Sequence, residues 1–254
     1  MTEMISTGAS VDRRIQSYGE TGLLVQFDEG DVVSASESVF ALNQRLRDMK
    51  LRGIQSTTPS YVSLLIIFDP SVLAPNHLAS TLTTLLECSQ AALASDTPIT
   101  NSNAWCLPTL FVGEEDEDAV ALRDELGLSW SEVVERFCTV SYRVNALGFL
   151  PGFTYLGGLP EALHCRRLTT PRARIPASSV AIAGQQAGIY PMDSPGGWRI
   201  LGRLPFSIFD QSCSSPTLFS PNDRITFQPT SEPHFSELAR AADNGELALD
   251  RFKQ

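Results

Sequence analysis

The sequence predicts an α+β protein whose first half mixes helices with strands and whose second half is mainly β. Up to about residue 138, apolar residues at helical spacing alternate with short β-like runs. From Thr139 onward the helical spacing disappears, and short apolar runs follow one another with Gly or Pro between them. The chain is 43% hydrophobic and 19% charged, a composition typical of globular domains.

The first part of the chain is predicted to be a sheet crossed by two helices. Residues 15–19 and 23–27 are short β-like runs, and the aliphatic run 61–68 predicts a buried strand. Ser34, with Glu three residues later, predicts a capping box that opens the first helix, and Pro75 predicts the start of the second. Two helices on one sheet favour an α+β sandwich of ferredoxin-like type.

A polar segment around Pro98 is typical of a linker. We therefore place the N-terminal α+β domain at residues 1–98 and a β-barrel domain at residues 99–232. The last residues, 233–254, are expected to form a helical tail with an interruption near Asn244.

The barrel domain is expected to begin with a strand and two capped helices. Trp105–Val112 is strand-like, and the acidic run 114–118 suits a loop that becomes the first turn of a helix. Gly127 is the expected C′ residue of that helix, and Ser129 with Glu132 predicts a second capping box. Consecutive acidic side chains point in different directions, so we expect no metal site there.

Five later apolar runs are separated by Gly or Pro, which is typical of a small closed or nearly closed β-barrel. They are 142–147, 180–183, 198–201, 208–209 and 225–227.

The segment from Gly148 to Pro205 concentrates the features of a binding site. It holds nine of the 17 glycines and seven of the 16 prolines of the chain. Six arginines lie between Arg166 and Arg203 with a single acid, Asp193, although the whole chain carries a net charge of −10. Stiff turns with clustered guanidinium groups favour an anion-binding site, and a barrel whose turns need Gly and Pro is an equal alternative.

Bulk properties exclude several functional classes. The acidic balance argues against non-specific nucleic-acid binding, and neither of the two lysines follows a glycine-rich loop, so a Walker A motif is absent. The longest aliphatic run is too short to cross a membrane. Five widely spaced cysteines and no signal-like N-terminus predict free thiols in the cytoplasm, and three scattered histidines predict no zinc site.

The second half of the chain carries several short motifs close together. They are GFLPGFTYLGG from Gly148, PR at Pro171, IPA at Ile175, SVAIAG at Ser179, GIYP at Gly188, SPGGW at Ser194 and GR at Gly202. Together they resemble one family, that of the B-type subunit of 5-oxoprolinase, also called allophanate hydrolase subunit 1 or KipI-like. This many short motifs in one order is far more specific than a lone glycine-rich pattern.

The resemblance implies an N-terminal α+β domain followed by a cyclophilin-like barrel. It also implies a related carboxyltransferase-type subunit and a third subunit as partners, which together hydrolyse 5-oxoproline, a small anion, to glutamate with ATP and its Mg²⁺ counter-ion. No tightly bound cofactor and no metal ligand is expected. Alternatives within the family are a protein inhibitor of a histidine kinase and a component of a urea carboxylase or allophanate hydrolase system. The fold alone does not distinguish these functions.

The site residues follow from the charge that lactam opening develops on phosphate and oxyanion. We assign catalytic roles to Arg172, Arg203 and Gln185. The substrate-binding candidates are Ser179, Tyr190, Tyr155, Trp198, Arg199, Gly188, Gly196 and Gly197. The simpler alternative pairs the arginines with surface carboxylates and packs Tyr155 and Trp198 as structural aromatics, with Phe149 and Phe153 in the core.

The chain departs from the family pattern at four positions. Phe137 stands where members often carry His, Ser178 where Gly is usual, and Ala187 and Leu204 where Thr is usual. If the lost hydroxyls touch substrate, the specificity of this chain is altered.

Overall fold

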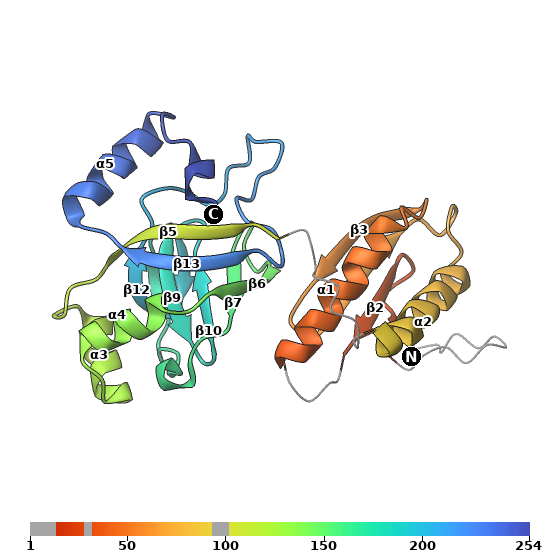
Figure 1. Ribbon diagram of the computed structural model, residues 1–254, viewed down its shortest axis with the longest axis horizontal. Helices are drawn as coiled ribbons and strands as arrows, with labels where there is room; N and C mark the ends of the chain where they lie inside the picture. Colours follow the sequence, from red (N-terminus) through yellow and green to blue (C-terminus); the bar gives the residue numbers. More distant parts are fainter. Residues whose placement is uncertain (1–13, 28–31, 93–101) are drawn as a thin grey trace. The chain divides into compact units, whose positions relative to one another are not determined.

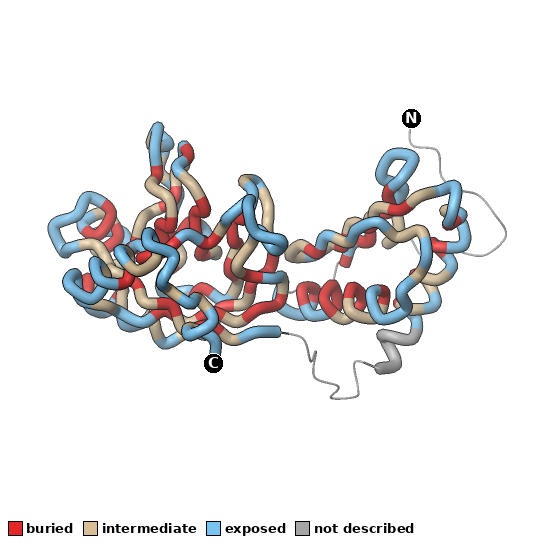
Figure 2. The backbone as a smooth tube through the Cα atoms, turned by 90° about the horizontal axis from the view of Figure 1, so that it is seen from above, coloured by how far each residue is buried: buried red, intermediate tan, exposed pale blue. Residues whose placement is uncertain are grey.

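The computed structural model describes residues 14–27, 32–92 and 102–254 and divides into two compact units, Met1–Thr100 and Asn101–Gln254 (Figure 1). We call them the N-terminal unit and the barrel unit. Figure 2 shows buried segments inside each unit, so each has a core of its own. No described helix has the length and apolar character needed to cross a membrane.

The N-terminal unit is a four-stranded antiparallel sheet with two helices. The strand order is β1-β2-β4-β3. Helices α1 and α2 contact each other and the sheet, and their apolar faces form one core with Val25, Leu64 and Ile66. The elements are β1 (Ile15–Ser17), β2 (Gly22–Gln26), α1 (Val32–Asp48), β3 (Ile54–Pro59), β4 (Ser63–Phe68) and α2 (Pro75–Ala92).

The start of α2 at Pro75 is confirmed, the expected cap at Ser34 is wrong, and one strand was not predicted. Helix α1 already includes Val32, so Ser34 lies inside the helix and does not cap it. Strand β3 has no counterpart among the predicted strands, because its polar sequence IQSTTP lacks an apolar alternation. The described order is ββαββα, so the ferredoxin-like label stays a prediction.

The barrel unit is built on a closed barrel of strand order β10-β7-β6-β13-β5-β12-β9. Strands β5 and β13 pair in parallel and the other neighbours are antiparallel. The predicted closed barrel is confirmed, and its cyclophilin-like name stays a prediction. The strands are β5 (Ala104–Phe111), β6 (Tyr142–Leu147), β7 (Thr154–Gly157), β9 (Ser179–Ala183), β10 (Gln186–Ile189), β12 (Arg199–Arg203) and β13 (Arg224–Pro229).

Helices α3 (Glu117–Leu126) and α4 (Trp130–Cys138) connect β5 to β6. Both local predictions here are confirmed: Gly127 ends α3 with φ +66°, and Ser129 and Glu132 form a complete capping box. A short ladder of β8 (Arg172–Ile175) and β11 (Ser194–Gly196) lies outside the barrel. The predicted strand at 208–209 is wrong, because Phe209 makes only an isolated bridge to Thr217.

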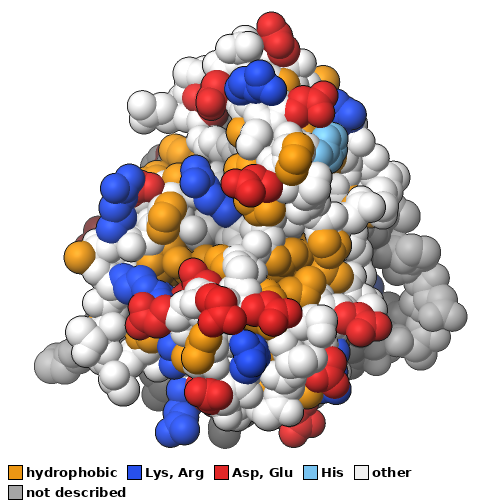
Figure 3. All heavy atoms as spheres, turned by 90° about the vertical axis from the view of Figure 1, so that its left-hand side faces the viewer, with side chains coloured by type: hydrophobic (Ala, Val, Ile, Leu, Met, Phe, Trp, Pro, Cys, Tyr) orange, Lys and Arg blue, Asp and Glu red, His pale blue; other side chains and the backbone are white. Residues whose placement is uncertain are grey.

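The C-terminal tail packs against the barrel. It comprises α5 (Glu232–Asp243) and a 3₁₀ turn, η2 (Leu249–Phe252), separated near Asn244 as expected. Phe252 stacks on Phe206 of the barrel unit with ring centroids 5.1 Å apart. On the face seen in Figure 3, charged side chains surround a central group of apolar ones.

One buried carboxylate joins α3, β8 and β12. The Asp118 side chain is 1% exposed and accepts a hydrogen bond from the Arg172 guanidinium at 2.9 Å and another from the Ile200 N–H at 2.8 Å. The Arg199 guanidinium lies 3.6 Å from the same carboxylate. A carboxylate that is out of water is stable only with such compensation, so these contacts fix three elements against one another.

Replacing Asp118 should destabilise the barrel unit strongly. Asp118→Asn leaves two arginines without their shared anion, and we expect unfolding free energy to fall by about 3–5 kcal/mol. All three tryptophans, Trp105, Trp130 and Trp198, lie in this unit, so tryptophan fluorescence in urea follows its unfolding.

The control is Asp193→Asn, which removes the partner of Arg174 in an exposed ion pair. Exposed pairs contribute little, so its unfolding curve should stay close to that of the parent chain. Equal losses in the two variants would show that Asp118 is not the structural centre of this region.

Candidate functional site

Most of the candidate residues lie around two hollows of the barrel unit. We call the first, of about 380 Å³, the charged hollow. Its lining is Leu110, Phe111, Val112, Asp116, Glu117, Asp118, Arg172, Pro176, Ser179, Ile200, Gly202 and Arg203. It therefore holds three of the sequence candidates, Arg172, Ser179 and Arg203.

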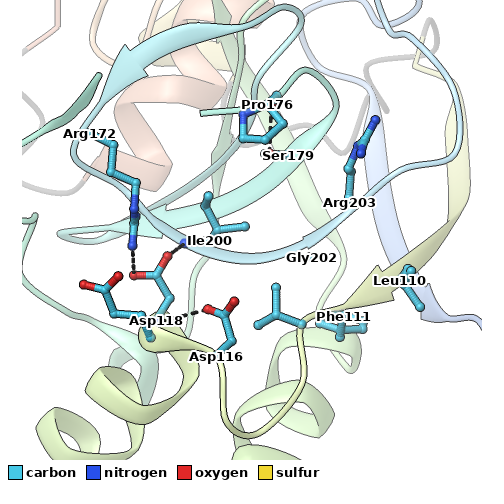
Figure 4. A pocket seen from close by; sticks show the side chains of 12 residues that line it. Leu110, Phe111, Asp116, Asp118, Arg172, Pro176, Ser179, Ile200, Gly202 and Arg203 are labelled. Carbon is cyan, nitrogen blue, oxygen red and sulfur yellow. Dashed lines mark hydrogen bonds and ion pairs between the residues drawn. The ribbon is translucent and has the colours of Figure 1, made fainter. Parts of the chain in front are cut away.

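The charges of this hollow do not form an anion site by themselves. Three carboxylates line it against two guanidinium groups. Arg172 points to Asp118 (Figure 4), so its charge is already neutralised. The described residues give the exposed Arg203 side chain no ion pair. Ser179 donates its hydroxyl to the Pro176 carbonyl at 2.7 Å, so that group is engaged within its own turn.

The second hollow, of about 340 Å³, is lined mainly by aromatic rings and turns, and we call it the aromatic hollow. Its lining is Phe149, Phe153, Tyr155, Arg167, Leu168, Pro171, Tyr190, Pro195, Gly196, Gly197 and Trp198. It brings together five sequence candidates: Tyr155, Tyr190, Gly196, Gly197 and Trp198.

The aromatic walls pack around Phe153. Its ring centroid lies 4.6 Å from Tyr155, 4.8 Å from Tyr190 and 5.6 Å from Trp198. Phe153 and Trp198 are buried, as the packing alternative predicts, and they still line the hollow. The rings are therefore both core and wall, so the hollow has a rigid shape.

Two glycines keep this region open. A methyl group at Gly196 would lie 2.5 Å from the Tyr190 Oη, and one at Gly188 would lie 2.9 Å from Trp198 Cζ3. Any larger residue at either position would push an aromatic ring out of place. Gly188 thus makes room for Trp198 without lining the hollow, whereas Gly196 lines the hollow and makes room for Tyr190.

The aromatic hollow has one charged residue, Arg167, which sequence reasoning did not assign to the site. Its guanidinium carbon lies 5.7 Å from the Trp198 ring centroid. Burial raises the pKa of Tyr190 to about 12, so its hydroxyl stays neutral at physiological pH. Burial also raises the pKa of Tyr155, and the nearby Arg167 charge partly offsets that effect.

The expectation that Phe149 lies in the core is wrong. It is 74% exposed, lines the aromatic hollow and has φ +72°. A bulky side chain at positive φ is uncommon and strained. From the sequence, a Phe that follows Gly148 is expected to pack in the core, because most Phe side chains do and the residue type does not reveal an exposed one.

Besides Gly188, two assigned residues line neither hollow. Arg199 is directed to Asp118 and also lies 4.0 Å from Glu125, so it is part of the buried charge network. Gln185 is exposed in the turn between β9 and β10 and lines neither hollow. The roles assigned to both stay predictions.

The four departures from the family pattern lie in the interior. Phe137 packs on Tyr142 and Phe227, and Ala187 and Leu204 belong to the barrel core, so the hydroxyls usual at 187 and 204 would face that core. Ser178 has φ +63°, a conformation that suits glycine. Its hydroxyl donates to the Phe206 carbonyl at 2.8 Å. These departures therefore concern packing rather than the hollows.

The described residues contain no group of three or more His, Cys, Asp or Glu side chains placed to hold a metal ion. The described cysteine side chains, Cys106, Cys138, Cys165 and Cys213, form no disulfide, and Cys88 lies outside the described side chains. Burial raises the pKa of the Cys165 thiol to about 12, which leaves it unreactive.

Comparisons with known proteins agree on one relationship. The B-type subunit of 5-oxoprolinase from Escherichia coli O157:H7 is 34% identical over 86% of this chain and 97% of its own length. The protein of the same name from Bacillus subtilis strain 168 is 29% identical over 89% of this chain and 96% of its own. Urea amidolyase of Saccharomyces cerevisiae is 28% identical over 47% of this chain and 7% of its own.

Solved structures extend the relationship to the fold. The crystal structure of TTHA0988 superposes with a TM-score of 0.69 at 32% identity, and the match spans 84% of this chain but only 40% of that one. The urea amidolyase of K. lactis superposes with a TM-score of 0.67 at 20% identity over 93% of this chain and 16% of its own, which shows a shared fold. The family model for the carboxyltransferase domain, subdomain C and D, matches residues 13–219. The chain belongs to that family.

Proposed function

We propose that this chain is the B-type subunit of a multi-subunit enzyme that opens 5-oxoproline to glutamate with ATP. The observation that supports the proposal most is the similarity to the B-type subunit of Escherichia coli 5-oxoprolinase, which extends over 97% of that protein. A match of that extent covers both units of this chain rather than one shared module.

The two hollows differ in how well they suit this substrate. 5-Oxoproline is a small ring with a flat amide and one carboxylate. The charged hollow opposes an anion, because its carboxylates outnumber its guanidinium groups. The aromatic hollow has one guanidinium, no carboxylate and flat apolar walls. We therefore assign the substrate to the aromatic hollow.

Lactam opening needs groups that this hollow lacks. The carbonyl carbon must gain the oxygen of water while the ring C–N bond breaks and the nitrogen leaves as an amine. In the proposed reaction the terminal phosphoryl group of ATP would transfer to the amide oxygen and release ADP, and phosphate would then leave from the carbonyl carbon after water adds to it. The lining offers no His, Cys, Asp, Glu or Lys as general base, and its tyrosines have raised pKa values. We therefore place the base and the nucleotide outside the aromatic hollow.

A component of a urea amidolyase-type system is the second candidate. The similarity to the Saccharomyces cerevisiae urea amidolyase over 47% of this chain favours it. It would place a urea-derived carboxylate or amide in the same hollow. The kinase-inhibitor alternative stays a prediction.

Reconstitution tests the proposed reaction. This chain should support glutamate release from 5-oxoproline when co-purified with its carboxyltransferase-type partner and the third subunit, and release should stop when ATP is withheld. Enzyme-coupled detection of glutamate is the measurement, with each subunit omitted in turn. Release that is unaffected by omitting this chain would refute the proposal.

Arg203 tests whether the charged hollow takes part in catalysis. Its side chain is exposed and the described residues give it no ion pair, so Arg203→Ala should leave the urea unfolding curve unchanged. If its charge stabilises the transferring phosphate or the oxyanion, kcat of the complex should fall by about a hundredfold or more. Arg174→Ala, another exposed arginine, is the matched control. Equal kcat values for the two variants would remove Arg203 from the site.

A further inference from the structure

The aromatic hollow combines apolar aromatic walls with one cation, Arg167, to which the described residues give no ion pair. This combination indicates the kind of ligand that it binds. We infer that it binds a small flat carboxylate, with Arg167 holding the carboxylate, the ring packed against Trp198 and Tyr155, and Phe149 covering it. The choice of 5-oxoproline as the ligand rests on the proposed function. The assignment of Arg167 and Phe149 rests on the geometry of the hollow.

The walls select a flat group of limited size. Tyr155 and Trp198 lie with ring centroids 6.0 Å apart and 61° between their planes, and Phe153 packs against both. These rings are locked by the core behind them, so the hollow changes shape little on binding. Gly196 leaves the space beside these rings open, because any side chain there would meet Tyr190.

Arg167 is placed to bind a carboxylate. It is exposed, it lies over the Trp198 ring, and the described residues give it no ion pair. The lining holds no acid that would compete for it. A guanidinium binds a carboxylate through two parallel hydrogen bonds, and its flat face can stay on the indole meanwhile.

Phe149 is placed to cover the ligand. It lies in the loop between β6 and β7, in edge-to-face contact with Phe153 at 6.0 Å between centroids. Its φ of +72° is strained for a bulky side chain, and its ring is 74% exposed. Strain combined with exposure of an apolar ring is unfavourable in the free chain, and a ligand under the ring would offset it by burying that surface.

The experiment compares two ligands by isothermal titration calorimetry on the full chain. 5-Oxoproline carries the ring and the carboxylate, and 2-pyrrolidinone carries the same lactam ring alone. We expect 2-pyrrolidinone to bind at least about tenfold more weakly, since it lacks the charge-assisted hydrogen bonds.

Four variants separate the two roles. Arg167→Ala should weaken 5-oxoproline by about tenfold or more and leave 2-pyrrolidinone nearly unchanged, so the two affinities converge. Arg167→Lys should restore part of the difference by keeping the charge without the fork. Phe149→Ala should weaken both ligands by a similar factor. Arg166→Ala is the matched control, because the Arg166 side chain is exposed, pairs with Glu125 and lines neither hollow.

Each outcome decides the inference. Undetectable binding of 5-oxoproline at millimolar concentration, or an Arg167→Ala chain that still distinguishes the two ligands, would overturn it. Convergence of the two affinities only in Arg167→Ala supports it. The result is independent of turnover: binding without glutamate release in the reconstituted complex contradicts the proposed function and keeps the site, and release without binding does the reverse.

Discussion

A buried carboxylate holds α3 and β8 against the barrel strand β12. Asp118 accepts hydrogen bonds from Arg172 and from the Ile200 backbone, and Arg199 lies beside it. Arg172 in turn donates to the Trp198 carbonyl at 3.4 Å. The start of α3, the strand β8 and the wall of the aromatic hollow are thereby joined through one charge. A buried carboxylate needs these donors, so its contacts tie a wall of the charged hollow to Trp198 in the wall of the aromatic hollow.

The pairing of arginines with carboxylates reduces the positive charge that the segment 166–203 offers to a ligand. In the sequence, this segment is strongly basic. In the structure, four of its six arginines lie within 4.0 Å of a carboxylate, two of them at Asp118. Only two have no ion pair with a described residue, and each lines a different hollow: Arg203 the charged one and Arg167 the aromatic one. Local charge along a chain therefore overestimates the cation available to a ligand.

The features that can be predicted from the sequence depend on neighbouring residues. Gly127 and the Ser129 capping box are local signals, and the structure confirms both. The Asp118–Arg172 pair joins positions 54 residues apart, and no periodicity marks it. The acidic run around Asp118 predicts a solvated loop. The sequence does not show which of these consecutive carboxylates is buried. The motifs that carry the family resemblance did place Trp198 and Tyr190 at one hollow, although the strain at Phe149 appears only in the backbone.

The chemistry of the aromatic hollow also bears on why the proposed enzyme would need several chains. Rings packed into the core supply shape, and one guanidinium supplies charge, but a hydrolytic step needs a base that the lining does not contain. In TTHA0988 the corresponding region is 40% of a longer chain, so there a further segment accompanies it covalently. One polypeptide would then supply a rigid recognition site that excludes water from one side of the substrate. Another would supply the reactive groups that attack it from the other side. Under the proposed function, binding would belong to this chain and bond cleavage to its junction with a partner.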